Sequence, residues 1–200
     1  MNTLDVVNKC LAKMGEAPVE SLTEDHPFVP TALSNLQLVR ERTLMRGWWF
    51  NTEVLDVQPD EDGFLNLPGD ALSVDTGSPY VVKRGSKLYN TAEATDVFTR
   101  GAKILVKRDI AFDDLVPEAQ HYIGLRAVQE FQSDYDGDST KTKMLMAEVA
   151  EARAELNAAH TRANEYNVIS GNPRLMQMHI ATRGVRGFAM THVPLGRFPS

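Results

Sequence analysis

A long heptad pattern near the C-terminal end limits the possible folds more than any other feature of this sequence. Between residues 139 and 167 apolar side chains recur in alternating steps of four and three, at Leu145, Val149, Ala152, Leu156, Ala159 and Ala163. The pattern predicts one helix roughly 43 Å long, because each residue of an α-helix adds 1.5 Å. Alanine dominates the seam and lets backbones approach closely, so we expect the partner of this helix to be another helix.

Three earlier segments also have helical signals. Residues 3–14 read as a helix with Thr3 as its cap and Gly15 as its C-terminal glycine. A second helix is expected from about Pro30 to Arg46, ended by Gly47, with Leu33, Leu36, Leu44 and Met45 on its apolar face. A third begins at Pro117 and is apolar almost all round as far as Phe131, so we expect it to be the most buried. Residues 134–138 should end it.

The segment between the second and third helices has short β-like runs separated by turns. Residues 59–63 and 67–70 have turn composition, and Tyr80–Lys83 and Lys87–Tyr89 flank Arg84-Gly85-Ser86 in the pattern of a hairpin. Residues 102–107 read as a further strand. The sequence therefore predicts an α+β fold. We expect a helical bundle domain (1–50 and 109–167), a small antiparallel β insertion (51–108) and an extended C-terminal arm (168–200).

The predicted arm differs in charge from the rest of the chain. It contains four arginines and no lysine or acid, so its charge is +4 where the whole chain carries −6, which leaves −10 for the remainder. It also has no helical period. We expect the arm to dock on a neighbouring subunit or a partner protein, with Arg174, Arg183, Arg186 and Arg197 as interface residues. Folding back on its own subunit is the alternative.

Composition excludes several function classes. A net charge of −6 argues against a nucleic-acid binder, which needs a basic surface. The N-terminus lacks the pattern of a signal peptide, and no apolar run is long enough for a membrane helix, so we expect a soluble protein made in a cytoplasm. The one cysteine, Cys10, lies in a helical pattern and is interpreted as a small buried apolar residue.

No catalytic or metal-binding constellation emerges from the sequence. Asp134, Asp136 and Asp138 suggest a calcium loop, but glycine falls at the fourth place (Gly137) and Leu145 stands where an EF-hand needs glutamate. Glu130 with Asp134 or Asp136 could form a glycosidase pair, although 27 acids make some such pair inevitable. The five histidines are scattered. We expect no catalytic residue, metal or cofactor.

The strongest aromatic cluster is Trp48-Trp49-Phe50. One interpretation makes it a core plug that seats the second helix on the sheet. The other places Trp48 or Trp49 at a subunit contact, where aromatic residues are enriched.

Two motifs in order give the chain a family resemblance. The opening helix ends in Met14-Gly15-Glu16-Ala17-Pro18-Val19, and the second helix is followed by Arg46-Gly47-Trp48-Trp49-Phe50-Asn51. Both resemble motifs of the tail tubular protein A family of T7-like short-tailed phages, Ile-Gly-Glu-x-Pro-Val and Arg-Gly-Trp-x-Phe-Asn. The Pro117-Glu118 start of the third helix and the long alanine-rich fourth helix agree more weakly, so the resemblance covers residues 4 to 167.

The resemblance implies a structural virion protein and not an enzyme. Such proteins form a twelve-subunit ring at the head–tail junction, between the portal and the tail nozzle protein (tail tubular protein B), with the tail fibre as a further candidate partner. Double-stranded DNA passes through the ring without specific binding, and an acidic body would not hold it. Two alternatives stay open: a phage-encoded capsule or cell-wall glycan hydrolase, and a scaffold or chaperone-like protein absent from the mature particle.

Overall fold

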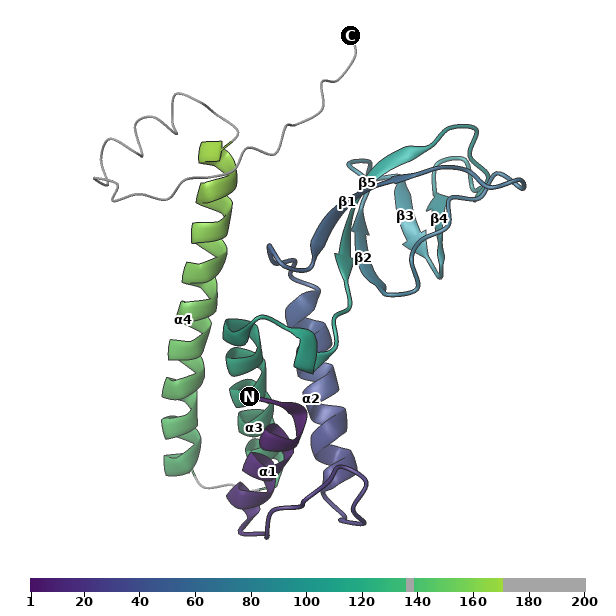
Figure 1. Ribbon diagram of the computed structural model, residues 1–200. Coiled ribbons are helices and arrows are strands. Elements are labelled where there is room, and N and C mark those ends of the chain that lie inside the picture. Colours follow the sequence, from purple (N-terminus) through teal and green to yellow (C-terminus); the bar gives the residue numbers. More distant parts are fainter. Residues whose placement is uncertain (136–138, 171–200) are drawn as a thin grey trace. The chain divides into compact units, whose positions relative to one another are not determined.

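The computed structural model describes residues 1–135 and 139–170, which form four α-helices and five β-strands (Figure 1). The helices are α1 (Thr3–Met14), α2 (Val29–Leu44), α3 (Pro117–Tyr135) and α4 (Ser139–Ser170). The strands are β1 (Thr52–Val57), β2 (Ala71–Asp75), β3 (Val81–Arg84), β4 (Lys87–Asn90) and β5 (Ala102–Arg108), and a short 3-10 helix, η1 (Phe112–Asp114), precedes α3. The predicted α+β class, with a β insertion between the second and third helices, is confirmed.

Residues Met1–His160 form one compact unit that contains α1 to α3, all five strands and α4 as far as His160. The second unit begins at Thr161, and its described part is the rest of α4. The domain borders at 50/51, 108/109 and 167/168 stay predictions. The predicted arm, with its four arginines, and Asp136, Gly137 and Asp138 of the acidic turn lie outside the described residues. No described helix is long and apolar enough to cross a membrane.

The start of α1 corrects one prediction. Asn2, and not Thr3, caps the helix: its side chain accepts a hydrogen bond from the Asp5 backbone, while the Asp5 carboxylate accepts one from the Asn2 backbone, both at 2.8 Å. This reciprocal pair satisfies two backbone N–H groups that the first turn leaves without partners. Thr3 instead donates its backbone and hydroxyl hydrogens to Asp113, beside α3. Gly15 ends the helix at φ 77°, as expected.

Helix α2 buries a narrower face than its leucines suggested. Val29, Ala32, Leu36 and Val39 recur in steps of three and four and are all at most 4% exposed. Met45, which was expected on the apolar face, is 48% exposed, because it follows the helix end and lies about 100° round from the buried Leu44.

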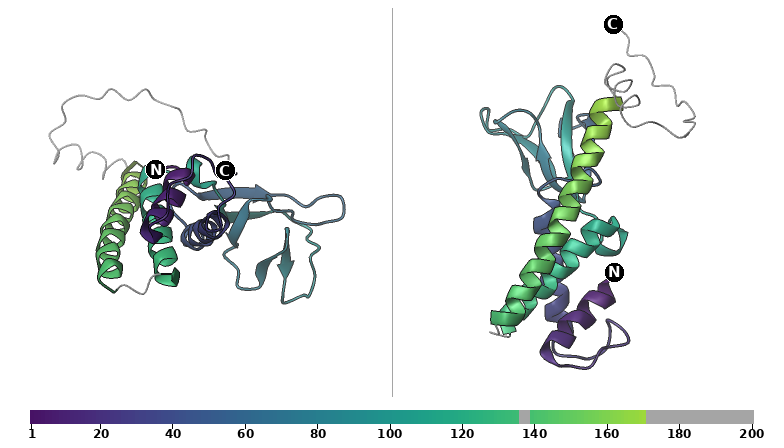
Figure 2. Two further views of the ribbon diagram at one scale, coloured as in Figure 1. Left: turned by 90° about the horizontal axis from the view of Figure 1, so that it is seen from below. Right: turned by 90° about the vertical axis from the view of Figure 1, so that its left-hand side faces the viewer.

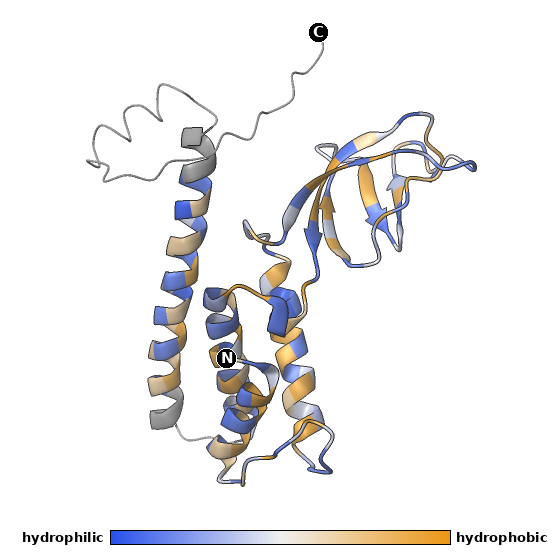
Figure 3. Ribbon diagram, in the orientation of Figure 1, coloured by the Kyte–Doolittle hydropathy of each residue, from blue (hydrophilic) through white to orange (hydrophobic). Residues whose placement is uncertain are grey.

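Helix α3 is the most buried, as predicted, and α4 packs along it. Nine α3 residues are buried, more than on α1 or α2. The predicted α4 seam is buried from Leu145 to Ala159, and Val149 and Ala152 pack against Leu125 of α3. The two helices run antiparallel (Figures 1 and 2). Hydrophilic and hydrophobic residues alternate along α4 (Figure 3), so only one stripe of it belongs to the core.

The β insertion has a core of its own. Strands β1 and β2 both pair antiparallel with β5, in the order β1-β5-β2, and β3 pairs with β4 in the predicted hairpin. The turn of this hairpin is Gly85-Ser86, with Gly85 at φ 64°, a conformation that glycine adopts without strain. The inner faces bury Leu65, Leu67, Ala71, Leu88, Ile104 and Val106.

Candidate functional site

The junction between the helices and the β insertion is the motif Gly47–Asn51, directly after α2. Gly47 has φ 79° and donates its backbone N–H to the carbonyl of Leu44 at 3.0 Å. A Cβ atom at this position would lie 2.8 Å from the side chain of Lys107 on β5. The flexible end of that lysine side chain could move aside, so the left-handed turn is what requires glycine here.

Trp48 belongs to the core of its own subunit. It is 2% exposed, and its indole Nε1 donates to the Thr43 carbonyl at 2.8 Å. Its ring stacks parallel to Phe50 at 6.5 Å and meets His160 of α4 edge-on at 5.3 Å. Trp49 is only partly buried, with ring centroids 4.9 Å from Phe50 and 5.9 Å from His160. Within the subunit, Trp48 is therefore a core residue. A contact with another subunit stays a prediction, and the partly buried Trp49 is better placed than Trp48 to make that contact.

Asn51 holds the two parts together with its side chain. It is 1% exposed, and its Oδ1 accepts a hydrogen bond from the Trp48 backbone at 2.8 Å. Its Nδ2 donates to the carbonyls of Leu44, at the end of α2, and Arg108, at the end of β5, both at 3.0 Å. The Asn51 carbonyl also accepts from the Arg108 backbone at 2.7 Å. One amide side chain therefore bonds three backbone groups: one at the end of α2, one in the turn after it and one at the end of β5.

Two ion pairs flank this junction. Arg40 of α2 meets Asp109 just after β5 at 3.0 Å, and Arg108 meets Asp70 at 2.8 Å. The Arg40–Asp109 pair is partly shielded from solvent, with side chains 18% and 30% exposed, whereas Asp70 in the second pair is 46% exposed. The junction is consequently fixed by directional contacts as well as by packing.

A pocket of about 310 Å³ lies among α2, α3 and α4, and four of its nine described lining residues are arginines. Arg42 and Arg46 come from α2 and the turn after it, Arg126 from α3, and Arg153 from α4. The one acid in the lining is Glu130, so the ionisable side chains carry a net charge of +3. The rest of the lining is Val39, Thr43, Trp48 and Tyr122. This arginine pocket contrasts with the charge of −6 on the whole chain.

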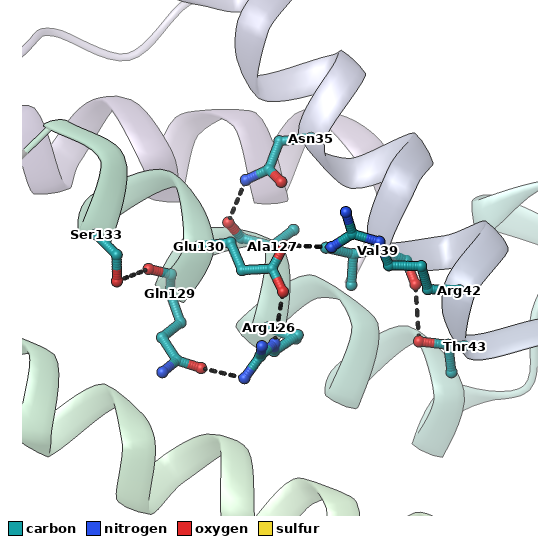
Figure 4. A network of polar contacts seen from close by, with 9 residues as sticks. All are labelled: Asn35, Val39, Arg42, Thr43, Arg126, Ala127, Gln129, Glu130 and Ser133. Atoms are coloured by element: carbon teal, nitrogen blue, oxygen red, sulfur yellow. Dashed lines mark hydrogen bonds and ion pairs between the residues drawn. The ribbon is translucent and has the colours of Figure 1, made fainter.

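Glu130 forms ion pairs with two of the four arginines of the pocket (Figure 4). Its carboxylate accepts a bond from Arg126 Nε at 2.8 Å and from Arg42 Nη1 at 3.4 Å. Arg126 also donates from Nη1 to the side-chain oxygen of Gln129 at 3.1 Å, so its guanidinium is held on two sides. Arg42 and Arg126 are thereby fixed in place while one negative charge neutralises one of the two.

The wall between α2 and α3 is also pinned by polar contacts. Asn35 donates its side-chain N–H to the Ala127 carbonyl at 2.9 Å, and Thr43 donates its hydroxyl to the Val39 carbonyl at 2.8 Å (Figure 4). Thr43 is thus already engaged with its own helix. Among the described residues, the lining contains no histidine, cysteine or serine, and its one carboxylate is ion-paired. These groups can bind an anion.

The other two arginines of the pocket have unshared charge. The guanidinium of Arg46 lies 5.1 Å from the centre of the Trp48 ring, a cation–π contact. Within residues 1–135 and 139–170, no carboxylate lies within 4 Å of Arg46 or Arg153. Both side chains are exposed, so both are free to meet an external anion.

Cys10 behaves as the sequence predicted. It is fully buried in the bundle core, and burial raises the pKa of its thiol to about 12. A thiol in that state is a packing group and not a nucleophile. Among the described residues, no group of three or more histidine, cysteine or acidic side chains is arranged to hold a metal ion.

The arginine pocket was missed by the sequence reasoning. The first and last of its four arginines, Arg42 and Arg153, are 111 positions apart, and only Arg42 and Arg46 are near each other in sequence, four residues apart. Two like charges at that spacing repel each other on a helix. This repulsion is the one local signal that an opposite charge should lie near them.

Comparison with known proteins gives two matches. The family model described as tail tubular protein matches residues 4–166 of the chain. Tail tubular protein A of Klebsiella phage KP34 is 33% identical over 143 residues, which cover 70% of this chain and 76% of that protein.

Proposed function

This chain belongs to the tail tubular protein family, and from that premise we propose that it is the subunit of the adaptor ring that joins the phage portal to the tail nozzle. Membership makes it a structural protein of a phage tail. The finer role, a twelve-subunit ring that continues the DNA channel and receives tail tubular protein B, is the proposal. The match over residues 4–166 carries it, because it spans all the described helices and strands except the last turn of α4.

The architecture of the subunit supports an adaptor. An adaptor must contact different partners above and below, and this chain has two separately cored parts: a helical bundle and a β insertion. The Asn51 junction ties them, so a load on one part reaches the other through buried hydrogen bonds. Closed rings also need heterologous contacts between identical subunits. Helix α4 offers many exposed side chains for such contacts between Lys143 and Glu155, outside its buried seam.

The four arginines of the C-terminal arm are part of the same proposal. We propose that Arg174, Arg183, Arg186 and Arg197 meet acidic groups on a neighbouring subunit or on the portal or nozzle protein. The charge of +4 on residues 168–200 against −10 on the remainder supports this pairing.

Assembly on the portal tests the proposal. The buried seam of α4 leaves no wholly apolar strip for spontaneous association, so the purified protein should sediment as a monomer or weak oligomer. Mixed with portal, it should form a ring with twelvefold symmetry in negative-stain images. Failure to bind portal, or a stable dodecamer at low micromolar concentration without portal, would contradict this assembly route.

The hydrolase and scaffold hypotheses predict different results. A hydrolase would release reducing sugar from host capsule or peptidoglycan, and an Asp136→Ala variant would lose that activity while folding normally. We expect no release above a blank, because the acid in the arginine pocket is ion-paired to two arginines. A scaffold would be absent from purified virions, whereas an adaptor should be found there by mass spectrometry.

A further inference from the structure

We propose that the arginine pocket of one subunit receives an acidic ridge on helix α4 of the next copy, and that this contact orders the subunits head to tail. The inference rests on the proposed ring and names the contact within it. The acidic ridge consists of Glu148, Glu151 and Glu155, all exposed. Two independent features carry the inference: the excess charge of the pocket and the position of the ridge on the same helix.

Helix geometry places the two charges on opposite flanks of α4. Successive residues turn by about 100°, so Arg153 stands about 80° to one side of the buried seam, where it closes the arginine pocket. The three ridge glutamates stand roughly 60–120° to the other side. The arginine pocket therefore lies on one flank of α4 and the three ridge glutamates lie on the other. An identical copy can fit the first flank against the second, which is the heterologous arrangement that closes into a ring.

No contact within the described part of the subunit stabilises the negative charges of the acidic ridge. Glu148, Glu151 and Glu155 follow one another at steps of three and four, so they repel each other along the helix. No lysine or arginine lies three or four residues from any of them, and within the described ranges none has a basic side chain within 4 Å. The pocket has the converse imbalance, with Arg46 and Arg153 unpaired by carboxylates there. Each surface thus lacks what the other supplies.

A second copy fits the pocket better than DNA does. The pocket is a local hollow of about 310 Å³, not the continuous basic surface that neutralises a run of phosphates. Carboxylates on a helix ridge present single charges about one turn apart. Such charges can reach Arg46 and Arg153 while Arg42 and Arg126 stay paired with Glu130.

A charge exchange tests the contact. The variants Arg153→Glu and Glu151→Arg each place like charges in every interface, so each alone should lower portal-templated ring formation about tenfold or more. The chain with both changes should assemble again, because every interface is exchanged in the same sense. An equimolar mixture of the two single variants should also assemble, since alternating subunits then pair opposite charges. Lys103→Glu and Glu93→Arg, exposed changes of the same size in the β insertion, serve as matched controls and should assemble normally.

Each outcome bears on the inference separately from the proposed function. If wild-type protein forms the ring and both single variants do so equally well, this contact is wrong and the adaptor proposal stands. Loss in Glu151→Arg alone would mean that the ridge meets another basic surface, such as the arm, and would also overturn the contact. Loss of DNA retention in Arg153→Glu particles with normal assembly would assign the pocket to DNA instead.

Self-association provides a measurement that does not need the portal. At high protein concentration the same contact should give weak association of the wild type that fades with added salt, because exposed charges are screened. The single variants should show less association than the wild type, and their mixture should regain it. Wild-type protein that neither forms a ring on portal nor self-associates in this way would refute both the adaptor role and the contact.

Discussion

Replacing Asn51 with alanine should destabilise the protein far more than an ordinary surface change. The side chain is 1% exposed and makes three hydrogen bonds to backbone groups: it accepts from Trp48 and donates to Leu44 and Arg108. Alanine cannot replace any of them. Because the groups left behind lie at the junction of two cored parts, we expect the effect to appear as a loss of global stability.

The size of the destabilisation depends on which hydrogen bonds each of the three backbone groups retains in the variant. The Leu44 carbonyl retains a second bond, from the Gly47 N–H at 3.0 Å, so its loss is small. The Trp48 N–H loses its bond to Asn51 and is left buried, which costs about 2 kcal/mol, and the Arg108 carbonyl adds about 1 kcal/mol. The expected decrease in unfolding free energy is therefore about 3 kcal/mol. In a protein of this size that corresponds to a fall of roughly 6–12 °C in Tm.

Urea unfolding followed by tryptophan fluorescence measures this directly, since both tryptophans of the chain are at the junction. Asn51→Asp keeps the shape and the acceptor but loses both donated bonds, so it should also be strongly destabilising. Asn66→Ala is the control: Asn66 is exposed, makes one side-chain bond to Asp60, and should change stability by less than about 0.5 kcal/mol. An Asn51→Ala protein within that same range would refute the argument that this side chain ties the two parts.

Four further predictions concern other parts of the chain. Leu156→Ala, in the fully buried part of the α4 seam, should lower the unfolding free energy by about 2–5 kcal/mol in chemical denaturation, whereas Met144→Ala on the exposed side should change it little. Cys10, whose thiol pKa is raised to about 12 by burial, should resist a disulfide reagent at pH 8 until the protein is unfolded in urea. The pKa of Asp60 is lowered, chiefly by the hydrogen bond from the Phe64 backbone, so its NMR titration midpoint should lie below that of the unfolded chain. The stability that the Asp60 carboxylate adds is present above the ordinary carboxyl pKa and is lost as the pH falls through the lowered pKa of the folded state. Deleting residues 168–200 should leave Tm nearly unchanged but weaken co-sedimentation with portal or nozzle protein, and a fall of several degrees with binding intact would contradict an interface arm.

The helices were predictable because their signals are local. The α4 seam repeats over nearly three heptads, and the structure buries it from Leu145 to Ala159. Gly15 and Gly47 marked ends that depend on the left-handed conformation of single residues. Where a prediction was wrong, a neighbouring residue could satisfy the same requirement: Asn2 and Thr3 both have cap side chains, and only the pairing with Asp5 decides between them.

The junction and the arginine pocket could not be derived in the same way. Asn51 stood inside a motif that marked the family, but its partner Arg108 is 57 positions away and no local pattern connects them. The pocket needs α2, α3 and α4 to pack before its arginines converge. Local spacing can predict an element and one of its faces, but a set of charges gathered from three elements depends on tertiary packing.

The residues of the Gly47–Asn51 motif stabilise the fold of the single subunit. They therefore do not explain how subunits contact one another. The left-handed turn requires Gly47, the core position holds Trp48, and three hydrogen bonds to the backbone hold Asn51. A chain that keeps this fold needs these residues whether or not it forms a ring. The residues that bear on assembly are those that the isolated subunit does not need: Arg153 without a carboxylate in the described part of the chain, and an acidic ridge whose members repel one another. If the charge exchange restores assembly, the contact between copies will explain why the single subunit keeps an arginine without a carboxylate partner and a ridge of glutamates that repel one another.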